Sequence, residues 1–165
     1  MAVTVRPARP GDGAALSRVW LSAAVYYTDL DPEHFQVPQA EGLAESWDSQ
    51  FARHDDDSLD LVAELDGQVV GWLWARIEPP GQSASEQIVR ELGWTRLEVV
   101  SLFVDRDHWR GGAGTALLET AEAWGRVQGA QVARLDTYAD SPVSVPFYED
   151  HMGYRRRSIV FQKRL

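Results

Sequence analysis

The residues best suited to chemistry lie between Glu98 and Glu122, in the run EVVSLFVDRDHWRGGAGTALLETAE. Its first part, Val99 to Val104, is β-branched and aromatic, which predicts a buried strand. A charged corner follows, and then a glycine cluster from Arg110 to Thr115 that opens a helix. The first amides of a helix lack an intrahelical acceptor and lie at a positive dipole end, so glycines there let an anion approach the backbone. The run therefore predicts a turn that holds phosphate.

Two common nucleotide-binding turns fit this run less well. A P-loop needs a Lys-Ser/Thr pair after its glycines, and the run has none. The dinucleotide fingerprint G-x-G-x-x-G needs glycine where Leu117 stands, and it follows a strand directly, whereas a charged corner intervenes here. Asp136 lies far enough along the chain to contact a ribose, so NAD binding stays an alternative.

A second polar segment follows the helix. Ser141 and Pro142 predict the N-cap and first turn of a short helix that runs to about His151 and ends before Gly153. Tyr148 lies within this expected helix.

The glycine run resembles motif A of the GNAT superfamily of N-acetyltransferases, in which a strand ending in Val leads through R/Q-x-x-G-x-G/A into a helix. The glycines of that pattern fall on Gly112 and Gly114. The R/Q position falls on Trp109, which departs from the pattern, and Arg110 stands one place later.

Two other segments resemble the same superfamily. LVAELDGQVVGWLWA is similar to its central hairpin, V-A-E-x-D-G-x-V-V-G. Motif B, N-x-x-A-x-x-F/L-Y followed by G-F/Y, is matched with Ser in place of its Asn and Ala, and with one extra residue before the glycine. The residues that match motif B are Ser141, Ser144, Phe147, Tyr148, Gly153 and Tyr154.

The resemblance implies that acetyl-CoA is the co-substrate and that successive backbone amides hold its pyrophosphate. The residues it assigns to acetyl-CoA are Leu102, Phe103, Val104, Arg110, Gly111, Gly112, Ala113, Gly114, Thr115 and Ser141. It also implies that Tyr148 is the general acid for the departing thiolate.

Glu98 is the first candidate to receive the proton of the attacking amine. In an unbroken strand it would share a face with Val100, Leu102 and Val104, and Ser101 would lie on the opposite face. Asp136 or an acid between residues 28 and 34 are the alternatives. The chain has no cysteine and no G-x-S-x-G segment, which favours direct attack in a ternary complex over an acyl-enzyme.

The acceptor amine is expected to meet the variable segments, which are residues 26–35, the loop over residues 78–93 and the end of the strand over residues 132–138. Tyr26, Tyr27 and Phe35 offer aromatic walls, and Asp29 offers charge for a cationic amine of a small molecule or a peptide. Because Trp109 and Ser141 depart from the family pattern, a non-catalytic acyl-CoA-binding sensor or interaction module is the alternative function.

These elements predict one α/β domain over residues 1–165, with a GNAT-like mixed twisted sheet of six to seven strands flanked by about four helices. Helices are expected over residues 13–27, 39–54 and 141–151, and from residue 116 to an end marked by Gly125 and Gly129. Strands are expected over residues 3–6, 59–65, 68–75, 99–104, 132–138 and 154–164.

Composition narrows the partners. The net charge of −9 disfavours nucleic acid as a general partner. The absence of cysteine excludes disulfides and thiolate metal sites, and the four histidines lack metal-ligand spacing, so no metal is expected. The absence of cysteine also fits a cytoplasmic protein. No apolar run reaches the length of a membrane span, so no membrane partner is expected. A homodimer is allowed.

Overall fold

The computed structural model of this protein describes residues 2–53 and 55–165. By its internal contacts the chain forms two compact units. The first ends at Arg134 and the second is Leu135–Leu165.

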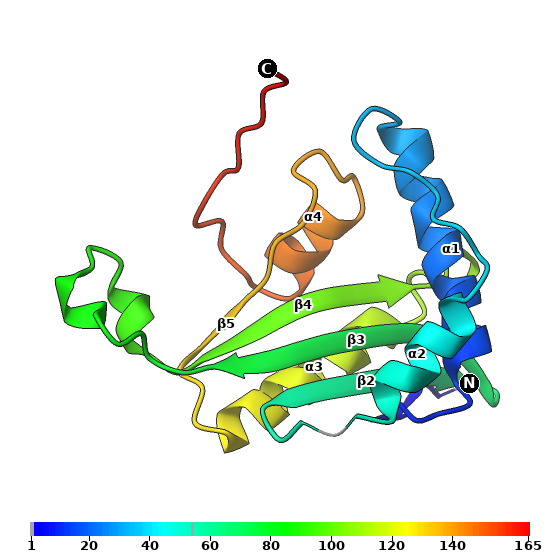
Figure 1. The fold of residues 1–165 in the computed structure, drawn as a ribbon, viewed down its shortest axis with the longest axis horizontal. Helices are drawn as coiled ribbons and strands as arrows, with labels where there is room; N and C mark the ends of the chain where they lie inside the picture. Colours follow the sequence, from blue (N-terminus) through cyan, green and yellow to red (C-terminus); the bar gives the residue numbers. More distant parts are fainter. Residues whose placement is uncertain (1, 54) are drawn as a thin grey trace. The chain divides into compact units, whose positions relative to one another are not determined.

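The first unit is built on a sheet in which neighbouring strands are antiparallel, except that β5 runs parallel to β4. The described residues form five strands in the order β1-β2-β3-β4-β5, so the expectation of six to seven strands is wrong. They are β1 (Thr4–Pro7), β2 (Ser58–Leu65), β3 (Gln68–Glu78), β4 (Arg96–Val104) and β5 (Val132–Arg134) (Figure 1).

The missing strand content lies after β5. This strand ends at Arg134 instead of Tyr138, and in the described part of the chain Tyr154–Arg164 forms no strand. A strand depends on a hydrogen-bonded neighbour for its stability. The ladders of the sheet include no described residue after Arg134, so the β-branched pattern of the tail has no such neighbour there.

The α-helices of the described chain are α1 (Gly13–Leu30), α2 (Leu43–Phe51), α3 (Ala113–Val127) and α4 (Ser144–Pro146). α1 runs past its expected end at Tyr27, and α2 begins at Leu43 instead of Gln39. The expected last residue of α2, His54, lies outside the described residues. Short 3₁₀ turns are η1 (Ala84–Glu86), η2 (Arg90–Gly93) and η3 (Arg106–His108), and the π-helical turn η4 (Phe147–His151) follows α4.

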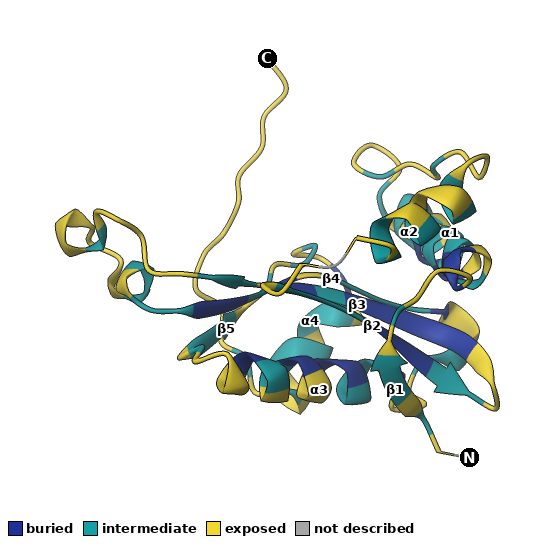
Figure 2. Cartoon of the chain, turned by 60° about the horizontal axis from the view of Figure 1, so that its bottom comes forward, coloured by how far each residue is buried: buried dark blue, intermediate teal, exposed yellow. Residues whose placement is uncertain are grey.

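Helices cover both faces of the sheet in the first unit (Figure 2). α1 and α2 lie on one face, where Trp20 packs against Trp47, Trp72 and Phe103 with ring centroids 5.8, 6.4 and 4.5 Å away. α3 lies on the other face and buries Leu117, Leu118 and Ala121 against it. Apolar residues at helical spacing explain both contacts.

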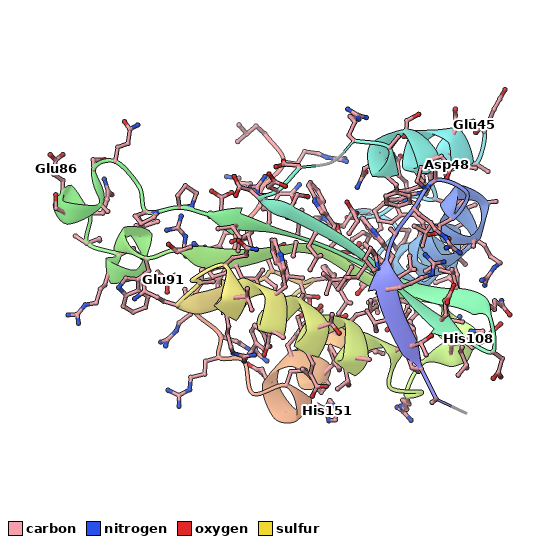
Figure 3. All side chains as sticks on the ribbon, turned by 90° about the horizontal axis from the view of Figure 1, so that it is seen from below. Glu45, Asp48, Glu86, Glu91, His108 and His151 are labelled. Atoms are coloured by element: carbon pink, nitrogen blue, oxygen red, sulfur yellow. The ribbon has the colours of Figure 1, made fainter. Side chains whose placement is uncertain are left out.

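The N-terminus of α1 meets α2 at very close range. A Cβ added at Gly13 would lie 2.1 Å from the carbonyl oxygen of Ala44, so only glycine fits. Asp48 of α2 accepts hydrogen bonds from the amides of Gly11 and Gly13 at 2.8 and 2.9 Å (Figure 3). Asp12 stands at the N-cap but its side chain does not cap the helix. The cap therefore comes from Asp48, a residue of another helix.

Asp12 instead belongs to a charge cluster beneath α1. Arg6 donates two hydrogen bonds of 2.8 Å to the Asp12 carboxylate and also binds Glu64 at 2.7 Å. Burial alone would raise the pKa of the Asp12 carboxyl, but hydrogen bonds from Arg6 and from the Arg9 amide hold that pKa below its usual value.

β4 contains a bulge that reverses the expected facing of its side chains. Trp74 of β3 pairs with Ser101 and Ala75 pairs with Val99, so Val100 is the extra residue. Since directly paired residues share a face of the sheet, Glu98 lies on the same face as Ser101. The expectation that Glu98 shares its face with Leu102 and Val104 is therefore wrong.

Candidate functional site

The turn predicted to hold phosphate, residues 110–115 (the phosphate turn), lies at the start of a helix as the glycine run predicted. Arg110 and Gly112 have φ of +61° and +86°, a left-handed conformation that glycine adopts without strain. α3 begins at Ala113, and no side chain caps its N-terminus. The first hydrogen bond of the helix runs from the Ala116 amide to the Gly112 carbonyl at 2.9 Å, so the helix itself provides no acceptor for the amides of Ala113 and Gly114.

Trp109 has a structural role at the R/Q position. Its indole Nε1 donates to the carbonyl oxygen of Val104 at 2.8 Å, and its ring packs edge-on against Tyr26 with centroids 4.8 Å apart. The tryptophan thus ties the corner to both β4 and α1. Arg110, which follows it, is exposed.

A buried carboxylate anchors the same corner to α1. Asp105 is 6% exposed, pairs with Arg18 and accepts a hydrogen bond of 3.1 Å from the Ser22 hydroxyl. Its backbone amide donates to Val70 at 2.8 Å. Arg18 and Ser22 lie on α1, more than 80 residues away from Asp105, so the local sequence contains no signal for this role.

The predicted acceptor residues lie at the end of α1 and beyond it. The Tyr26 and Tyr27 rings are 5.2 Å apart, and the Tyr27 and Phe35 rings are 5.0 Å apart. Burial raises the pKa of the Tyr26 phenol, and its hydroxyl has no hydrogen-bond partner within the described chain. Asp29 is exposed. Through Trp109, this aromatic group borders the phosphate turn.

The sheet face under α1 and α2 changes from apolar to polar along three rows of paired residues. The first row is apolar, with two aromatic side chains, and lies under the helices. The second row mixes an aromatic side chain with polar ones, and the third row is mainly charged. The rows are Val62, Trp72 and Phe103; Asp60, Trp74 and Ser101; and Ser58, Arg76, Glu98 and Arg134.

The tryptophans of β3 hydrogen-bond to polar groups on β2. Trp72 Nε1 donates to Asp60 Oδ1 at 3.0 Å, and Trp74 Nε1 donates to the Ser58 hydroxyl at 3.1 Å. Gln50 of α2 also donates to Asp60, at 3.1 Å. Burial raises the pKa of the Asp60 carboxyl, and the hydrogen bonds from Trp72 and Gln50 only partly offset this effect.

Glu98 lies in the charged row between two arginines. Arg76 of β3 and Arg134 of β5 are its direct neighbours in the ladders. Arg76 pairs with Glu78 at 2.8 Å, and Arg134 lies 3.7 Å from Glu91. No ion pair involving Glu98 occurs among the described residues. Its carboxylate is therefore available to another group.

A buried arginine holds the segment that carries Glu91. Arg96 is 7% exposed, and its Nη1 donates to the carbonyl oxygens of Glu91, Leu92 and Trp94 at 3.1, 3.3 and 2.9 Å. Figure 3 shows Glu91 on this segment, beside the end of the sheet. The long segment over residues 79–95 is thus fixed at its base.

One edge of β4 is open over most of its length. β5 pairs only with Arg96–Glu98, so the ladders of the described chain leave the other edge of Val99–Val104 without a strand. Leu102, Phe103 and Val104 lie on this stretch, which leads into the phosphate turn. Glu98 is six residues before Val104, about 20 Å along the strand, so the structure does not bring Glu98 next to the aromatic group of α1.

The second unit contains the other candidate residues. The Tyr148 ring lies 5.1 Å from Phe147 and 6.0 Å from Tyr154. Tyr148 is part of η4, in which the Met152 amide donates to the Phe147 carbonyl at 3.0 Å. Ser141 is buried, and its hydroxyl accepts the Ser144 amide at 3.0 Å. α4 begins at Ser144 with Val143 at its N-cap, so the expected helix start at Ser141 is wrong.

A family comparison decides the assignment of the chain. The model of the acetyltransferase (GNAT) family matches residues 23–154, which include the phosphate turn and Tyr148. The chain belongs to the GNAT family of acetyltransferases.

Solved structures support the GNAT fold. A transcriptional regulator from Bacillus halodurans C-125 is 20% identical with a TM-score of 0.74, covering 99% of this chain and 100% of that one. An aminoglycoside acetyltransferase from an uncultured soil metagenomic sample is 21% identical with a TM-score of 0.64, covering 100% and 99%. A ribosomal-protein-alanine N-acetyltransferase from Brucella melitensis biovar Abortus 2308 is 16% identical with a TM-score of 0.67, covering 100% of both chains. No curated protein sequence matches the chain.

The departures of this GNAT chain from the family pattern have local explanations. Trp109 holds the corner by packing and by a hydrogen bond to β4, roles that arginine or glutamine would fill differently. The extra residue between Tyr148 and Gly153 coincides with η4, because a π-helical turn contains one residue more than an α-helical turn.

Neither a metal-binding cluster nor a membrane-spanning helix occurs among the described residues. No group of three or more His, Cys, Asp or Glu side chains is placed to hold a metal ion. None of the helices there combines the length and apolar character that crossing a bilayer requires.

Proposed function

We propose that this GNAT protein, acting as one domain over residues 1–165, transfers an acetyl group from acetyl-CoA directly to an amine in a ternary complex. The observation that carries the proposal is the uncapped N-terminus of α3 behind Gly112. An array of amides at a positive helix end suits the pyrophosphate of a CoA thioester.

The residues of the turn fit this co-substrate. Ala113 and Gly114 offer amides that the helix does not use, and Thr115 belongs to the same first turn. Arg110 is exposed and offers a positive charge, and Gly111 and Gly112 keep the backbone accessible. Ser141 is proposed to act through the helix start that it stabilises.

The β4 edge is the second part of the proposed acetyl-CoA site. Leu102, Phe103 and Val104 lie where the ladder to β5 has ended, so their backbone groups are available to the pantetheine amides. When bound, acetyl-CoA supplies an acetyl group activated as a thioester.

The proton transfers are assigned to two residues. Glu98 takes a proton from the attacking ammonium, because its carboxylate has no ion-pair partner among the described residues. The Tyr148 phenol donates a proton as the C–S bond breaks. The N–C bond forms as the C–S bond breaks, one amine proton leaves through Glu98 to solvent, and the second restores the phenol.

The acceptor is proposed to be an amine of a small molecule or peptide. Structural relatives include proteins described as an aminoglycoside acetyltransferase and a ribosomal-protein-alanine N-acetyltransferase, so this fold serves amines of very different size. Tyr26, Tyr27, Asp29 and Phe35 are proposed to contact the part of a long acceptor that lies far from the reacting amine, since about 20 Å of β4 separates them from Glu98.

Thiol release from acetyl-CoA across a panel of amines tests the proposed function, together with calorimetry of acetyl-CoA and NAD binding. We expect acetyl-CoA to bind, NAD not to bind, and at least one amine to release thiol. Firm acetyl-CoA binding without thiol release for any amine would favour a non-catalytic sensor. NAD binding without acetyl-CoA binding would overturn the assignment of the turn.

A further inference from the structure

The charged row of the sheet has an arrangement that the proposed transfer alone does not need. Arg76, Glu98 and Arg134 occupy adjacent strands on one face, with the carboxylate in the middle. Side chains directly opposite each other on neighbouring strands have Cβ atoms about 5 Å apart, so both arginines are within reach of a small molecule bound at Glu98.

The two arginines pair away from Glu98. Arg76 binds Glu78 and Arg134 approaches Glu91, with side-chain exposures of 49% and 43% for the arginines. Exposed ion pairs contribute little stability, and the 3.7 Å separation of Arg134 from Glu91 is too long for a hydrogen bond. Either guanidinium can therefore exchange its partner for a ligand anion at small cost.

We propose that the acceptor carries a carboxylate beside its reacting amine, as free α-amino acids do. Glu98 faces the ammonium group, and the guanidinium groups of Arg76 and Arg134 hold the carboxylate. Charge and geometry favour these contacts. A planar guanidinium can donate two parallel hydrogen bonds to a carboxylate, and the carboxylate of Glu98 attracts an ammonium group. This inference rests on the proposed amine acetylation and names its substrate class.

The position of Arg134 supports this placement. It is the last residue of β5 that pairs with β4, opposite Glu98, and beyond this pair the edge of β4 is open. A ligand held by Arg134 thus has its amine at the point where the open edge of β4 begins. Arg96 fixes the base of the segment that carries Glu91, so the competing carboxylate of Glu91 has a defined place.

The alternative is that the row only stabilises the sheet through cross-strand charges. In that case amines with and without a carboxylate would be acetylated equally well, and the arginines would affect unfolding but not selectivity. Selectivity between matched acceptors separates the two readings.

The experiment measures kcat/KM by thiol release for pairs of acceptors that differ in one carboxylate, such as histidine and histamine or phenylalanine and phenethylamine. We expect the parent protein to prefer the amino acid of at least one pair by about 10-fold or more, the value of a charged hydrogen bond. Arg134→Gln and Arg76→Gln should each lower this preference about 10-fold. Arg126→Gln, which changes an exposed paired arginine on α3, is the matched control and should keep it.

Thiol release with equal or better use of the decarboxylated amine in every pair would overturn the inference and leave the proposed function intact. An unchanged preference in both arginine variants would also overturn it. Thiol release from no amine at all would instead contradict the proposed function. Thermal unfolding of each variant identifies any that fail to fold, and Arg134→Lys, which keeps the charge but loses the fork, should retain part of the preference.

Discussion

Gly114 gives a direct test of a backbone-held pyrophosphate, because its amide is among the first donors of α3. Proline is accepted in the first turn of a helix and has no N–H. We expect Gly114→Pro to weaken acetyl-CoA binding about 10-fold, the worth of one charged hydrogen bond, when measured by calorimetry. Gly114→Ala keeps the amide and serves as the control. Equal affinities for the two variants would show that this amide does not contact the ligand.

Tyr148 is tested by removing its hydroxyl. If the phenol protonates the leaving thiolate, Tyr148→Phe should lower kcat by about 10²–10⁴-fold, the usual loss for a general acid. Acetyl-CoA affinity should change little, because the ring contacts with Phe147 and Tyr154 remain. Phe147→Leu, a change in packing only, is the comparison. Parental turnover by Tyr148→Phe would assign the proton to water.

Single residues differ in how far the sequence alone reveals them. Gly112 could be predicted, since a glycine before a helix has a local reason to be there. Arg76 and Arg134 could not, because their importance arises from a row across three strands. The position of Asp105 likewise depends on partners in α1, which no short window of sequence contains.

At the scale of elements, the contact between α1 and α2 makes the sharpest prediction. Gly13→Ala would place a methyl group 2.1 Å from the Ala44 carbonyl oxygen and disturb the bond from the Gly13 amide to Asp48. Two helices would have to separate. We expect a loss of about 3 kcal/mol in the free energy of unfolding, as for overpacked cores, measured by urea denaturation.

The control for that variant is Ala14→Gly, at the next position of α1, which is exposed. It should cost about 1 kcal/mol through helix propensity alone. Similar losses for both variants would mean that α1 and α2 can move apart easily.

Elements with a strong period were predictable, and those fixed by distant contacts were not. α1, α3 and the β2–β3 hairpin follow from apolar spacing and from an Asp-Gly turn, and the structure confirms them. The bulge at Val100 has no signature in a run of β-branched residues, so the sequence does not reveal which face of the sheet Glu98 lies on. The strand expected over residues 154–164 has the composition of a strand, but composition does not show whether a neighbouring strand is present to pair with it.

At the scale of the whole molecule, the buried Asp12 and the partly buried Asp60 should affect stability in opposite directions. The folded pKa of Asp12 is lowered, so its charge stabilises the fold above about pH 4 and this contribution is lost as pH falls through the folded pKa. Asp12→Asn should lose about 2 kcal/mol at pH 7, less than for a fully enclosed pair because Arg6 is partly exposed. The loss should shrink below pH 4.

Asp60 should behave the other way. Its folded pKa is raised, so the unfolded chain releases this proton first and the fold loses stability as pH rises from about 4 through the raised value. Asp60→Asn keeps an oxygen for Trp72 and Gln50 and removes the partly buried charge. We expect a gain of up to about 1 kcal/mol at pH 7 that vanishes near pH 3. Chemical denaturation of Asp12→Asn and Asp60→Asn at several pH values tests both predictions. If both variants lost, or both gained, free energy of unfolding at pH 7, the prediction of opposite effects would be contradicted.

The open edge of β4 has a consequence for solvent exchange. Amides of Val99–Val104 that point away from β3 are not protected by a ladder in the described chain, so they should exchange with deuterium within seconds while their neighbours toward β3 resist for far longer. Alternating fast and slow exchange along β4 is a pattern that a bound ligand can change. A ligand that hydrogen-bonds to this edge should protect the outward-facing amides as well, so that exchange becomes slow along the whole strand. This change would report ligand binding without any chemical turnover.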